Sequence, residues 1–198
     1  LLENPHTGAL NMDQQQLISG IKDDSNRLLK ITGELLNMSQ VETGNIQLNI
    51  QKSSPLAIVS YAVEAVKIPL EQKDIQLITD FAGNVSDVKA DMEKTAWVLI
   101  NFLTNAVRYS KDGSKIEIGI LEEDRMVRFF VRDEGSGIDS RYNNKIFDRY
   151  FQVPGSSKTG TGLGLAISKE FIQAQGGTIG VTSEIGMGSI FYFELEKA

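Results

Sequence analysis

One polar face of an otherwise apolar segment carries the first residues that could do chemistry. In NFLTNAVRYS, Asn101, Asn105 and Arg108 follow at intervals of four and three residues, so a helix presents them on one face. The amide oxygen of Asn105 is a hard ligand of the kind that Mg²⁺ prefers, and an arginine suits phosphate. Buried asparagines that are satisfied by backbone groups are the competing interpretation of this pattern taken alone.

A second group of residues follows a predicted strand at 126–132. Asp133-Glu134-Gly135-Ser136-Gly137 places an aspartate at the end of the strand, followed by glycines that let a ligand approach the backbone closely. The carboxylate can accept a hydrogen bond from an amino group. A turn that only ends the strand is the competing interpretation of this group.

A glycine-rich stretch at 155–165 leads into a predicted helix. Backbone amides at the start of a helix favour anions such as phosphate. The commoner phosphate motifs do not fit, because Thr161-Gly162 stand where a P-loop has lysine and a hydroxyl residue, and the Rossmann glycine spacing is missing. Taken alone, this stretch is a weak signal.

The elements that must position these groups begin with a long helix. Residues 13–41 predict a single helix with Asn11 as its N-cap, because apolar residues recur at heptad spacing. The positions at this spacing are Leu17, Ile21, Asp24, Leu28, Ile31, Leu35 and Met38, which are apolar except for Asp24. A second apolar row, at Leu29 and Leu36, favours an intermolecular helical bundle over a core helix of the chain's own domain.

The pattern changes after residue 44, and we place a domain boundary near residue 45. The elements expected beyond it are a strand at 46–50, a helix from Pro55 to about Leu70, strands at 75–81 and 85–90, a helix capped by Asp91 that runs to about Tyr109, strands at 115–121 and 126–132, a helix at 165–175, and strands at 178–183 and 189–195. Gly83-Asn84 predicts a hairpin between the strands at 75–81 and 85–90. The order indicates an α+β fold with helices on one face of a mixed sheet.

Composition excludes several classes of function. The 198 residues carry a formal net charge of -6, which leaves no basic surplus for binding nucleic acid. The chain has no cysteine and one histidine, which excludes disulfide scaffolds, thiolate zinc sites and centres that need two imidazoles. No apolar run approaches the roughly 18 residues of a membrane helix. We therefore expect a soluble, cytoplasmic piece of a longer protein.

Taken together, the three groups resemble the ATP-binding catalytic domain of two-component sensor histidine kinases. This domain belongs to the Bergerat-fold group, with gyrase-type topoisomerases, heat-shock chaperones and mismatch-repair ATPases. The matching motifs are the asparagine box (Asn101, Asn105, Arg108, Tyr109), the first glycine box (Asp133, Gly135, Gly137), the phenylalanine box (146–151), the second glycine box (160–167) and the final glycine turn (186–191). Upstream, residues 27–48 resemble the second helix of the family's dimerisation and phosphotransfer hairpin.

The resemblance implies a fold and a domain organisation. The fold is α+β, a two-layer α/β sandwich of the Bergerat type with helices on one face of a mixed sheet, preceded by a long helix from a helical hairpin. Residues 1–44 correspond to the C-terminal part of the hairpin. Residues 45–198 correspond to the ATP-binding catalytic domain, with a mobile lid at about 148–161.

The resemblance also implies roles for the residues at the adenine and metal ends of the site. Asp133 would accept a hydrogen bond from the exocyclic amine of adenine, which rejects guanine, and Gly137 would let the base sit close. Asn105 would bind Mg²⁺ and act in catalysis with Asn101. The hydrolytic relatives carry a glutamate in place of Asn101, and an amide cannot replace that base, which favours transfer to a protein side chain over hydrolysis.

At the other end of the nucleotide, the implied contacts are with phosphate. Arg108 would hold the phosphates, while Tyr109 would border the adenine. The remaining residues expected to bind the nucleotide, most of them through backbone groups, are Gly135, Ile138, Gly160, Thr161, Gly162, Leu163, Gly164 and Leu165.

Two positions depart from the family's pattern. The only histidine, His6, stands in Pro5-His6-Thr7-Gly8, which fits the turn of the hairpin and not the phosphoacceptor. We therefore expect the first hairpin helix and the acceptor to be missing, so this piece should not phosphorylate itself. Gln152 occupies a lid position where many members carry an arginine, for which Arg149 or Lys158 could substitute.

The function implied by the resemblance is that of the catalytic ATP-binding portion of a sensor histidine kinase. It would use ATP and Mg²⁺ to phosphorylate a histidine outside this piece, from which a response regulator takes the phosphoryl group. A second copy would pair through the hairpin helices, and any membrane attachment would lie in missing parts of the parent. A nucleotide-sensing interaction module with weak catalysis remains the alternative, and a hydrolytic ATPase is disfavoured by Asn101.

Overall fold

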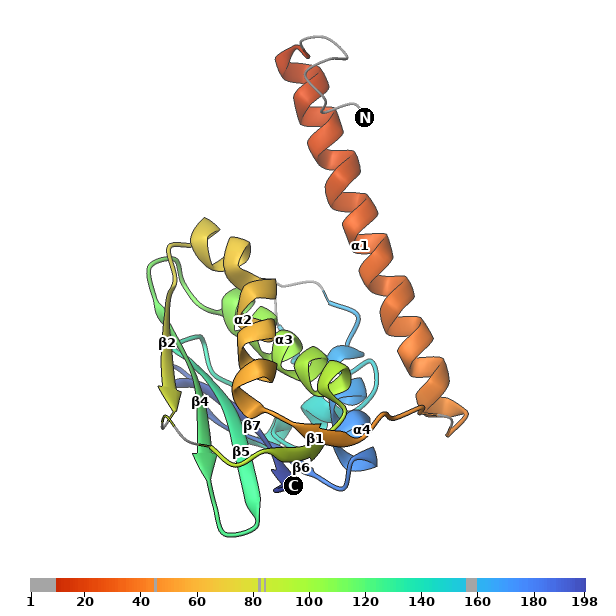
Figure 1. The fold of residues 1–198 in the computed structure, drawn as a ribbon. Helices are drawn as coiled ribbons and strands as arrows, with labels where there is room; N and C mark the ends of the chain where they lie inside the picture. The colour runs from red at the N-terminus through yellow and green to blue at the C-terminus, as the bar shows by residue number, and fades with distance from the viewer. Residues whose placement is uncertain (1–9, 45, 82, 84, 156–159) are drawn as a thin grey trace.

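The computed structural model describes residues 10–44, 46–81, 83, 85–155 and 160–198 of the chain. A long helix precedes an α/β domain (Figure 1). The elements are α1 (Met12–Glu42), β1 (Gln51–Ser53), α2 (Pro55–Gln72), β2 (Gln76–Phe81), β3 (Val88–Ala90), α3 (Met92–Tyr109), β4 (Lys115–Glu122), β5 (Met126–Asp133), the 3₁₀ turns η2 (Ser140–Tyr142) and η3 (Lys145–Phe147), α4 (Gly164–Ala174), β6 (Thr178–Glu184) and β7 (Gly188–Glu196).

The domain has two layers. Within the described part of the chain, five strands form a mixed sheet in the order β2-β4-β5-β7-β6, in which β2 runs parallel to β4 and the other neighbours are antiparallel. Helices α2, α3 and α4 cover one face of this sheet (Figure 1). The predicted α+β fold with helices on one face of a mixed sheet is confirmed.

Aromatic packing fixes α3 and α4 on the sheet. The ring of Phe102 from α3 lies 5.3 Å from that of Phe191 and 6.1 Å from that of Phe193, and Phe193 stacks on Phe129 at 4.8 Å. Phe171 of α4 meets Trp97 of α3 edge to face. Each fully buried phenylalanine contributes about 1.5–3 kcal/mol through its burial. The polar face of α3 is therefore carried on a firmly packed helix.

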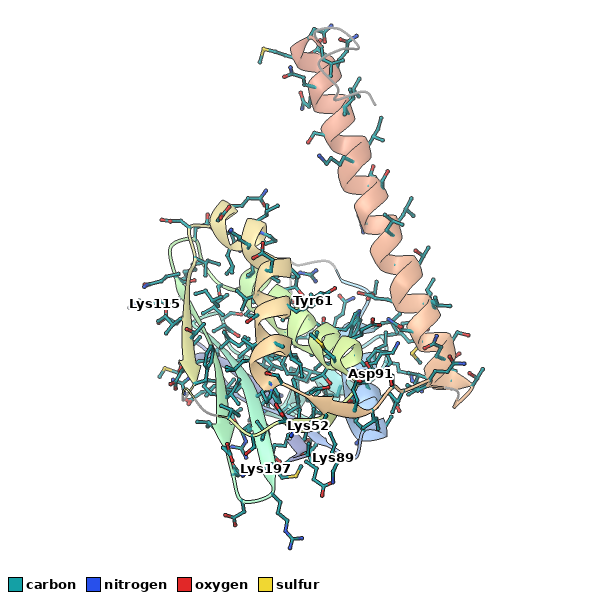
Figure 2. All side chains as sticks on the ribbon, in the orientation of Figure 1. Lys52, Tyr61, Lys89, Asp91, Lys115 and Lys197 are labelled. Carbon is teal, nitrogen blue, oxygen red and sulfur yellow. The ribbon has the colours of Figure 1, made fainter. Side chains whose placement is uncertain are left out.

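Local signals set the starts of α1, α2 and α3, as predicted. Asn11 and Gln14 form a capping box at the start of α1, and Ser54 caps α2 with Pro55 in the first turn. Asp91 accepts a hydrogen bond from the backbone N–H of Lys94 and so caps α3. Figure 2 shows Asp91 at this end of α3, beside the two-stranded sheet that holds Lys52 and Lys89.

Two predictions about strands are wrong. The predicted hairpin between 75–81 and 85–90 does not form, because β2 pairs in parallel with β4 while β3 pairs with β1 in a separate two-stranded sheet. The predicted strand at 46–50 is also absent from the described residues, since β3 is too short to pair beyond Gln51. The backbone N–H of Asn49 donates to the carboxylate of Asp91 in place of a strand partner. Asn84, part of the expected turn, lies outside the described residues.

The apolar stripe of α1 faces two environments. Met38 is buried and Ile31 is partly buried against the α/β domain, whereas Leu17, Leu28 and Leu35 are exposed. In Figure 2 the N-terminal half of α1 stands clear of the α/β domain. The stripe that predicted a bundle is thus partly used for packing within the chain. Among the described helices, none combines the length and apolar character that crossing a membrane requires.

Candidate functional site

A pocket of about 780 Å³ brings together the three polar groups of the sequence. This volume lies within the range of sites for small molecules, about 300–1,000 Å³. The predicted site residues that line it are Asn101, Asn105, Arg108, Tyr109, Asp133, Gly137, Ile138, Gly160, Thr161, Gly162, Gly164 and Leu165. Gly135 and Leu163 lie just behind this lining, where Gly135 binds the carboxylate of Asp133 and Leu163 is the buried N-cap residue of α4.

Asp133, the last residue of β5, is buried with only 5% of its surface exposed. The backbone N–H of Gly135 donates to its Oδ1 at 2.8 Å, and the backbone of Ser189 on β7 supplies a second hydrogen bond. Burial raises the pKa of the Asp133 carboxyl above its ordinary value, although the two backbone bonds act in the opposite direction. The result is a carboxyl acceptor with a fixed orientation, suited to recognising an amino group.

Close backbone contacts explain two of the glycines near Asp133. Gly137 has φ +67°, and a Cβ at this position would lie 1.9 Å from the carbonyl oxygen of Glu184. Gly188 has φ +82°, and its Cβ would lie 1.9 Å from the carbonyl oxygen of Asp133. Both positions therefore require glycine, because the backbone of the first glycine box packs here directly against the turn between β6 and β7. This reason for Gly137 is independent of any ligand.

Asn101 is oriented by a serine that the sequence reasoning missed. The hydroxyl of Ser168 on α4 donates to the carbonyl of Gly164 at 2.9 Å and accepts from Nδ2 of Asn101 at 3.0 Å. Because its one proton is used on Gly164, Ser168 meets Asn101 with a lone pair, and the carbonyl oxygen of the Asn101 amide points elsewhere. Ser168 is fully buried. A serine on the apolar face of a helix is the signal that could have found it.

The rest of the polar face of α3 adjoins both glycine segments. Nη1 of Arg108 would lie 3.1 Å from a Cβ built on Gly160, which places the guanidinium directly beside the second glycine box. Asn105 lies between Asn101 and Arg108 on the same helix face and also lines the pocket. Likewise, a Cβ built on Gly135 would lie 2.9 Å from the backbone carbonyl oxygen of Tyr109. A single helix therefore connects the two glycine boxes.

The predicted lid is only partly within the described residues, since 156–159, with Lys158, lie outside them. Nε2 of Gln152 donates to the carbonyl oxygen of Gly160 at 2.6 Å, so that the two described ends of this segment are joined. Arg149 faces α1 and α4, with its guanidinium 3.5 Å from the carboxylate of Glu42 and 3.9 Å from that of Glu170. It is not among the described pocket residues, which disfavours it as a substitute for the missing lid arginine.

Helix α1 forms a wall of the pocket that the sequence reasoning did not anticipate. Arg27, Ile31 and Glu34 line the pocket, and Glu34 accepts a hydrogen bond from the hydroxyl of Thr161. The sequence predicts α1 as part of a separate hairpin, and heptad spacing does not indicate contact with a segment more than a hundred residues away. Glu34, an acidic residue at helical spacing from the apolar Ile31 and Met38, is the signal that could have indicated this contact.

The donors in this pocket fit a magnesium ion that is held mainly by a nucleotide. Among the described residues, no group of three or more His, Cys, Asp or Glu side chains could hold a metal ion by itself. Mg²⁺ usually keeps several waters and binds through one or two protein oxygens together with substrate phosphates. The amide oxygen of Asn105, close to Arg108 on the same face, fits that description.

Three comparisons place the chain among known proteins. Residues 90–198 match the family model described as histidine kinase-, DNA gyrase B- and HSP90-like ATPase. Sensor protein SrrB of Staphylococcus aureus (strain N315) is 31% identical over 189 residues, covering 92% of this chain and 32% of SrrB. The chain thus spans about a third of the length of the curated relatives it matches.

Solved structures agree with this relationship. Full-length ShkA in complex with AMPPNP superimposes with a TM-score of 0.82 at 25% identity, covering 97% of this chain and 41% of ShkA. Histidine kinase ThkA in complex with response regulator protein TrrA gives a TM-score of 0.74 at 22% identity, covering 97% of this chain and 54% of ThkA. The second similarity concerns the fold alone. Both alignments include the long helix, because they cover nearly the whole chain.

Proposed function

Because this chain belongs to the family of histidine kinase-, DNA gyrase B- and HSP90-like ATPases, we propose that it is the catalytic ATP-binding portion of a sensor histidine kinase. The observation that carries this proposal is the pocket itself. It combines a buried carboxyl acceptor, an amide-rich helix face with an arginine, and a glycine-rich helix start. These groups suit an adenine, a metal-bound phosphate and a phosphate chain respectively.

In the proposed complex, each end of the nucleotide has its own set of residues. Asp133 accepts a hydrogen bond from the exocyclic amine of adenine, beside Tyr109. Arg108 and the backbone amides at the start of α4 hold the phosphates. Asn105 would hold Mg²⁺, which would supply positive charge to neutralise the phosphates. Asn101, with its amide orientation set by Ser168, contributes to positioning the reacting phosphate.

The proposed reaction is transfer of the γ-phosphoryl group to a histidine of another helix and then to a response regulator. An amide at Asn101 cannot remove a proton from water, which favours transfer over hydrolysis. The residues of the pocket contribute positioning and charge neutralisation, the main sources of catalysis in phosphoryl transfer. His6 lies outside the described residues, and its sequence context does not suit the acceptor, so we do not expect autophosphorylation.

Isothermal titration with ATP and GTP, each with and without Mg²⁺, tests the site. We expect selective binding of ATP that Mg²⁺ strengthens. Equal binding of GTP would contradict the role of Asp133, and the absence of binding to a folded sample would contradict the nucleotide site. Incubation with γ-labelled ATP tests the reaction, since label should reach a separately supplied acceptor helix and not this chain.

The exposed part of the α1 stripe supports a proposal about assembly. Leu17, Ile21, Leu28 and Leu35 leave an apolar row on the helix surface, which α1 of a second copy could cover in a helical bundle. We propose that this portion works in the cytoplasm as a homodimer, and that any membrane attachment lies elsewhere in a longer protein. Sedimentation equilibrium at several concentrations measures the dimer, and a strictly monomeric chain would contradict it.

One observation favours a second candidate function, a nucleotide-sensing interaction module. Gln152 is hydrogen-bonded to Gly160 at a lid position where an arginine is common in the family. Such a module would bind ATP and signal through α1 without transferring phosphate. Binding without any label on a complete acceptor helix would support this alternative, and measurable transfer would exclude it.

A further inference from the structure

Glu34 is buried, although it lies on a helix with many exposed side chains. Only 6% of its surface is exposed, and its carboxylate accepts a hydrogen bond from the hydroxyl of Thr161 in the second glycine box. Carboxylates are seldom buried without a specific partner, because their removal from water is costly. The contact is therefore a specific link between α1 and the proposed phosphate end of the pocket.

Neighbouring contacts hold this part of α1 in place. Met38 and Val41, about one and two turns beyond Glu34, are buried, and the Glu42 carboxylate lies 3.5 Å from the guanidinium of Arg149. Figure 1 shows this end of α1 near α4, while the opposite end projects away from the domain. The position of Glu34 in the pocket thus depends on the docking of the C-terminal part of α1.

The hydroxyl of Thr161 cannot serve Glu34 and a phosphate at the same time. It has one proton, which it donates to Glu34, while its oxygen accepts from the backbone N–H of Leu163 at 3.3 Å. Fully ionised phosphate oxygens are acceptors only. A phosphate group that accepts a hydrogen bond from the Thr161 hydroxyl must therefore replace Glu34 as its acceptor.

Charge acts in the same direction as this competition. Glu34 has the sign of the phosphates, whereas Arg27 and Arg108, which line the same pocket, have the opposite sign. Repulsion between like charges is stronger in a partly buried pocket than in water. The unfavourable contribution of Glu34 grows with each phosphate that a ligand carries.

We propose that Glu34 is a selectivity residue that makes the affinity for nucleotides depend on the docking of α1. This inference rests on the proposed function. With α1 docked, Glu34 holds Thr161 and disfavours ligands in proportion to their phosphate charge. Undocking of α1 withdraws the carboxylate, frees Thr161 and raises the affinity for ATP more than that for adenosine.

The competing role for Glu34 is that of a metal ligand, and the two roles predict opposite signs. A carboxylate that bound Mg²⁺ would strengthen ATP binding in the presence of the metal. Removal of the charge would then weaken ATP binding, whereas our inference requires it to become stronger. The sign of the change separates the two roles without any measurement of catalysis.

The test compares Glu34→Gln with the wild-type chain by calorimetry, with adenosine, ADP and ATP in Mg²⁺. We expect ATP affinity to rise about tenfold, ADP affinity to rise less and adenosine affinity to stay unchanged. Asp13→Asn is the matched control, because it removes one charge from an exposed position of α1 outside both the nucleotide pocket and the heptad stripe. It should leave all three affinities unchanged.

Several outcomes overturn the inference. A fall in ATP affinity for Glu34→Gln, an equal rise for all three ligands, or no change in a protein that binds ATP would each contradict it. If neither protein binds any of the ligands, the proposed function fails, and the inference fails with it. These patterns keep the two failures distinguishable.

A second measurement uses the reciprocity of coupling and needs no variant. If docked α1 weakens ATP binding, ATP must weaken the docking of α1 by the same factor. Hydrogen exchange of the backbone amides at 34–42 should therefore become faster when ATP is added to the wild-type chain, and adenosine should have no such effect. Slower exchange with ATP would overturn the inference.

Discussion

The pocket has two walls that are built differently. On one side, the α3 and β5 wall carries Asp133, held by two backbone hydrogen bonds, and Asn101, held by Ser168. Both residues belong to elements that pack on the aromatic core of the domain. This wall is set before any ligand arrives.

The opposite wall consists of α1 and the two described ends of the segment at 148–161. Individual polar contacts join its parts: Glu34 to Thr161, Gln152 to Gly160 and Arg149 to Glu42. Several of these groups are exposed to solvent, where ion pairs and hydrogen bonds contribute little. The comparison indicates that the wall proposed to recognise the base is preformed, while the wall at the proposed phosphate end could be altered by moving one helix.

The largest expected effect comes from removing the carboxyl group of the preformed wall. Asp133→Ala should lower ATP affinity about a hundredfold, because it removes the acceptor for the adenine amine and leaves two backbone N–H groups unpaired. Asp133→Asn is the matched variant: it keeps the shape but can present an amide N–H, so it should reduce the preference for ATP over GTP. Calorimetry with both nucleotides measures this. Unaltered ATP selectivity in Asp133→Asn would show that the base is recognised elsewhere.

The next effect distinguishes the metal from the base. Asn105→Ala should lower ATP affinity about tenfold in Mg²⁺ and leave it nearly unchanged in a chelator, because in the proposed complex the amide oxygen acts through the metal. Titrations under both conditions measure the difference. Equal losses with and without Mg²⁺ would argue for a direct contact with the nucleotide.

Ser168 tests whether the rigidity of the α3 wall depends on a buried hydrogen bond. Ser168→Ala should destabilise the fold by about 1 kcal/mol and lower ATP affinity in Mg²⁺ a few-fold, because Asn101 can then reorient. Ser168→Cys is a control of similar shape with much weaker hydrogen bonding. Urea unfolding and calorimetry give both quantities. Full recovery of affinity by Ser168→Cys would mean that packing, and not the orientation of Asn101, is what matters.

A smaller effect should appear on acidification. The raised pKa of Asp133 means that this carboxyl gains a proton at a higher pH than an ordinary aspartate does. Adenosine affinity should fall by about threefold as the pH is lowered through that pKa, since a neutral carboxyl group is a weaker acceptor. Titrations of adenosine across the same pH range avoid protonation of the phosphates. Asp133→Asn should lack this pH dependence.

The smallest expected effect lies in the opposite wall. Gln152→Ala removes one exposed hydrogen bond to Gly160, so it should change stability by less than about 1 kcal/mol and ATP affinity by less than about twofold. Hydrogen exchange of the Tyr150 amide, which donates to the carbonyl of Gly162 in the same segment, should become faster. A large loss of affinity would mean that this wall is as preformed as the other, and the contrast between the two would not hold.

Several features of the fold could be predicted from short stretches of sequence. The caps at Asn11, Ser54 and Asp91 each use a side chain and a backbone group three residues away, so the signal is local. The β4–β5 pair follows equally from two alternating segments joined by a short turn. Asn101, Asn105 and Arg108 were placed on one face by helical periodicity alone.

Strand pairing was less predictable, because alternation identifies a strand and not its partner. Residues 75–81 and 85–90 have the pattern of a hairpin, yet β2 joins β4 in parallel and β3 joins β1. The alternating residues at 46–50 form no strand, since the pairing of β1 with β3 ends at Gln51 and Ala90. Partner choice depends on surfaces that are assembled from distant parts of the chain.

The sequence by itself determined the class of fold, the three polar groups and the family, because motifs and periodicities are written in neighbouring residues. Only the tertiary structure decided that Ser168 orients Asn101, that Gly137 must fit against Glu184, and that α1 brings Glu34 to Thr161. Each of these is a contact between segments distant in the sequence, and it exists only after the core has packed. Local chemistry therefore indicated what the site contains, and packing decided how its residues are held.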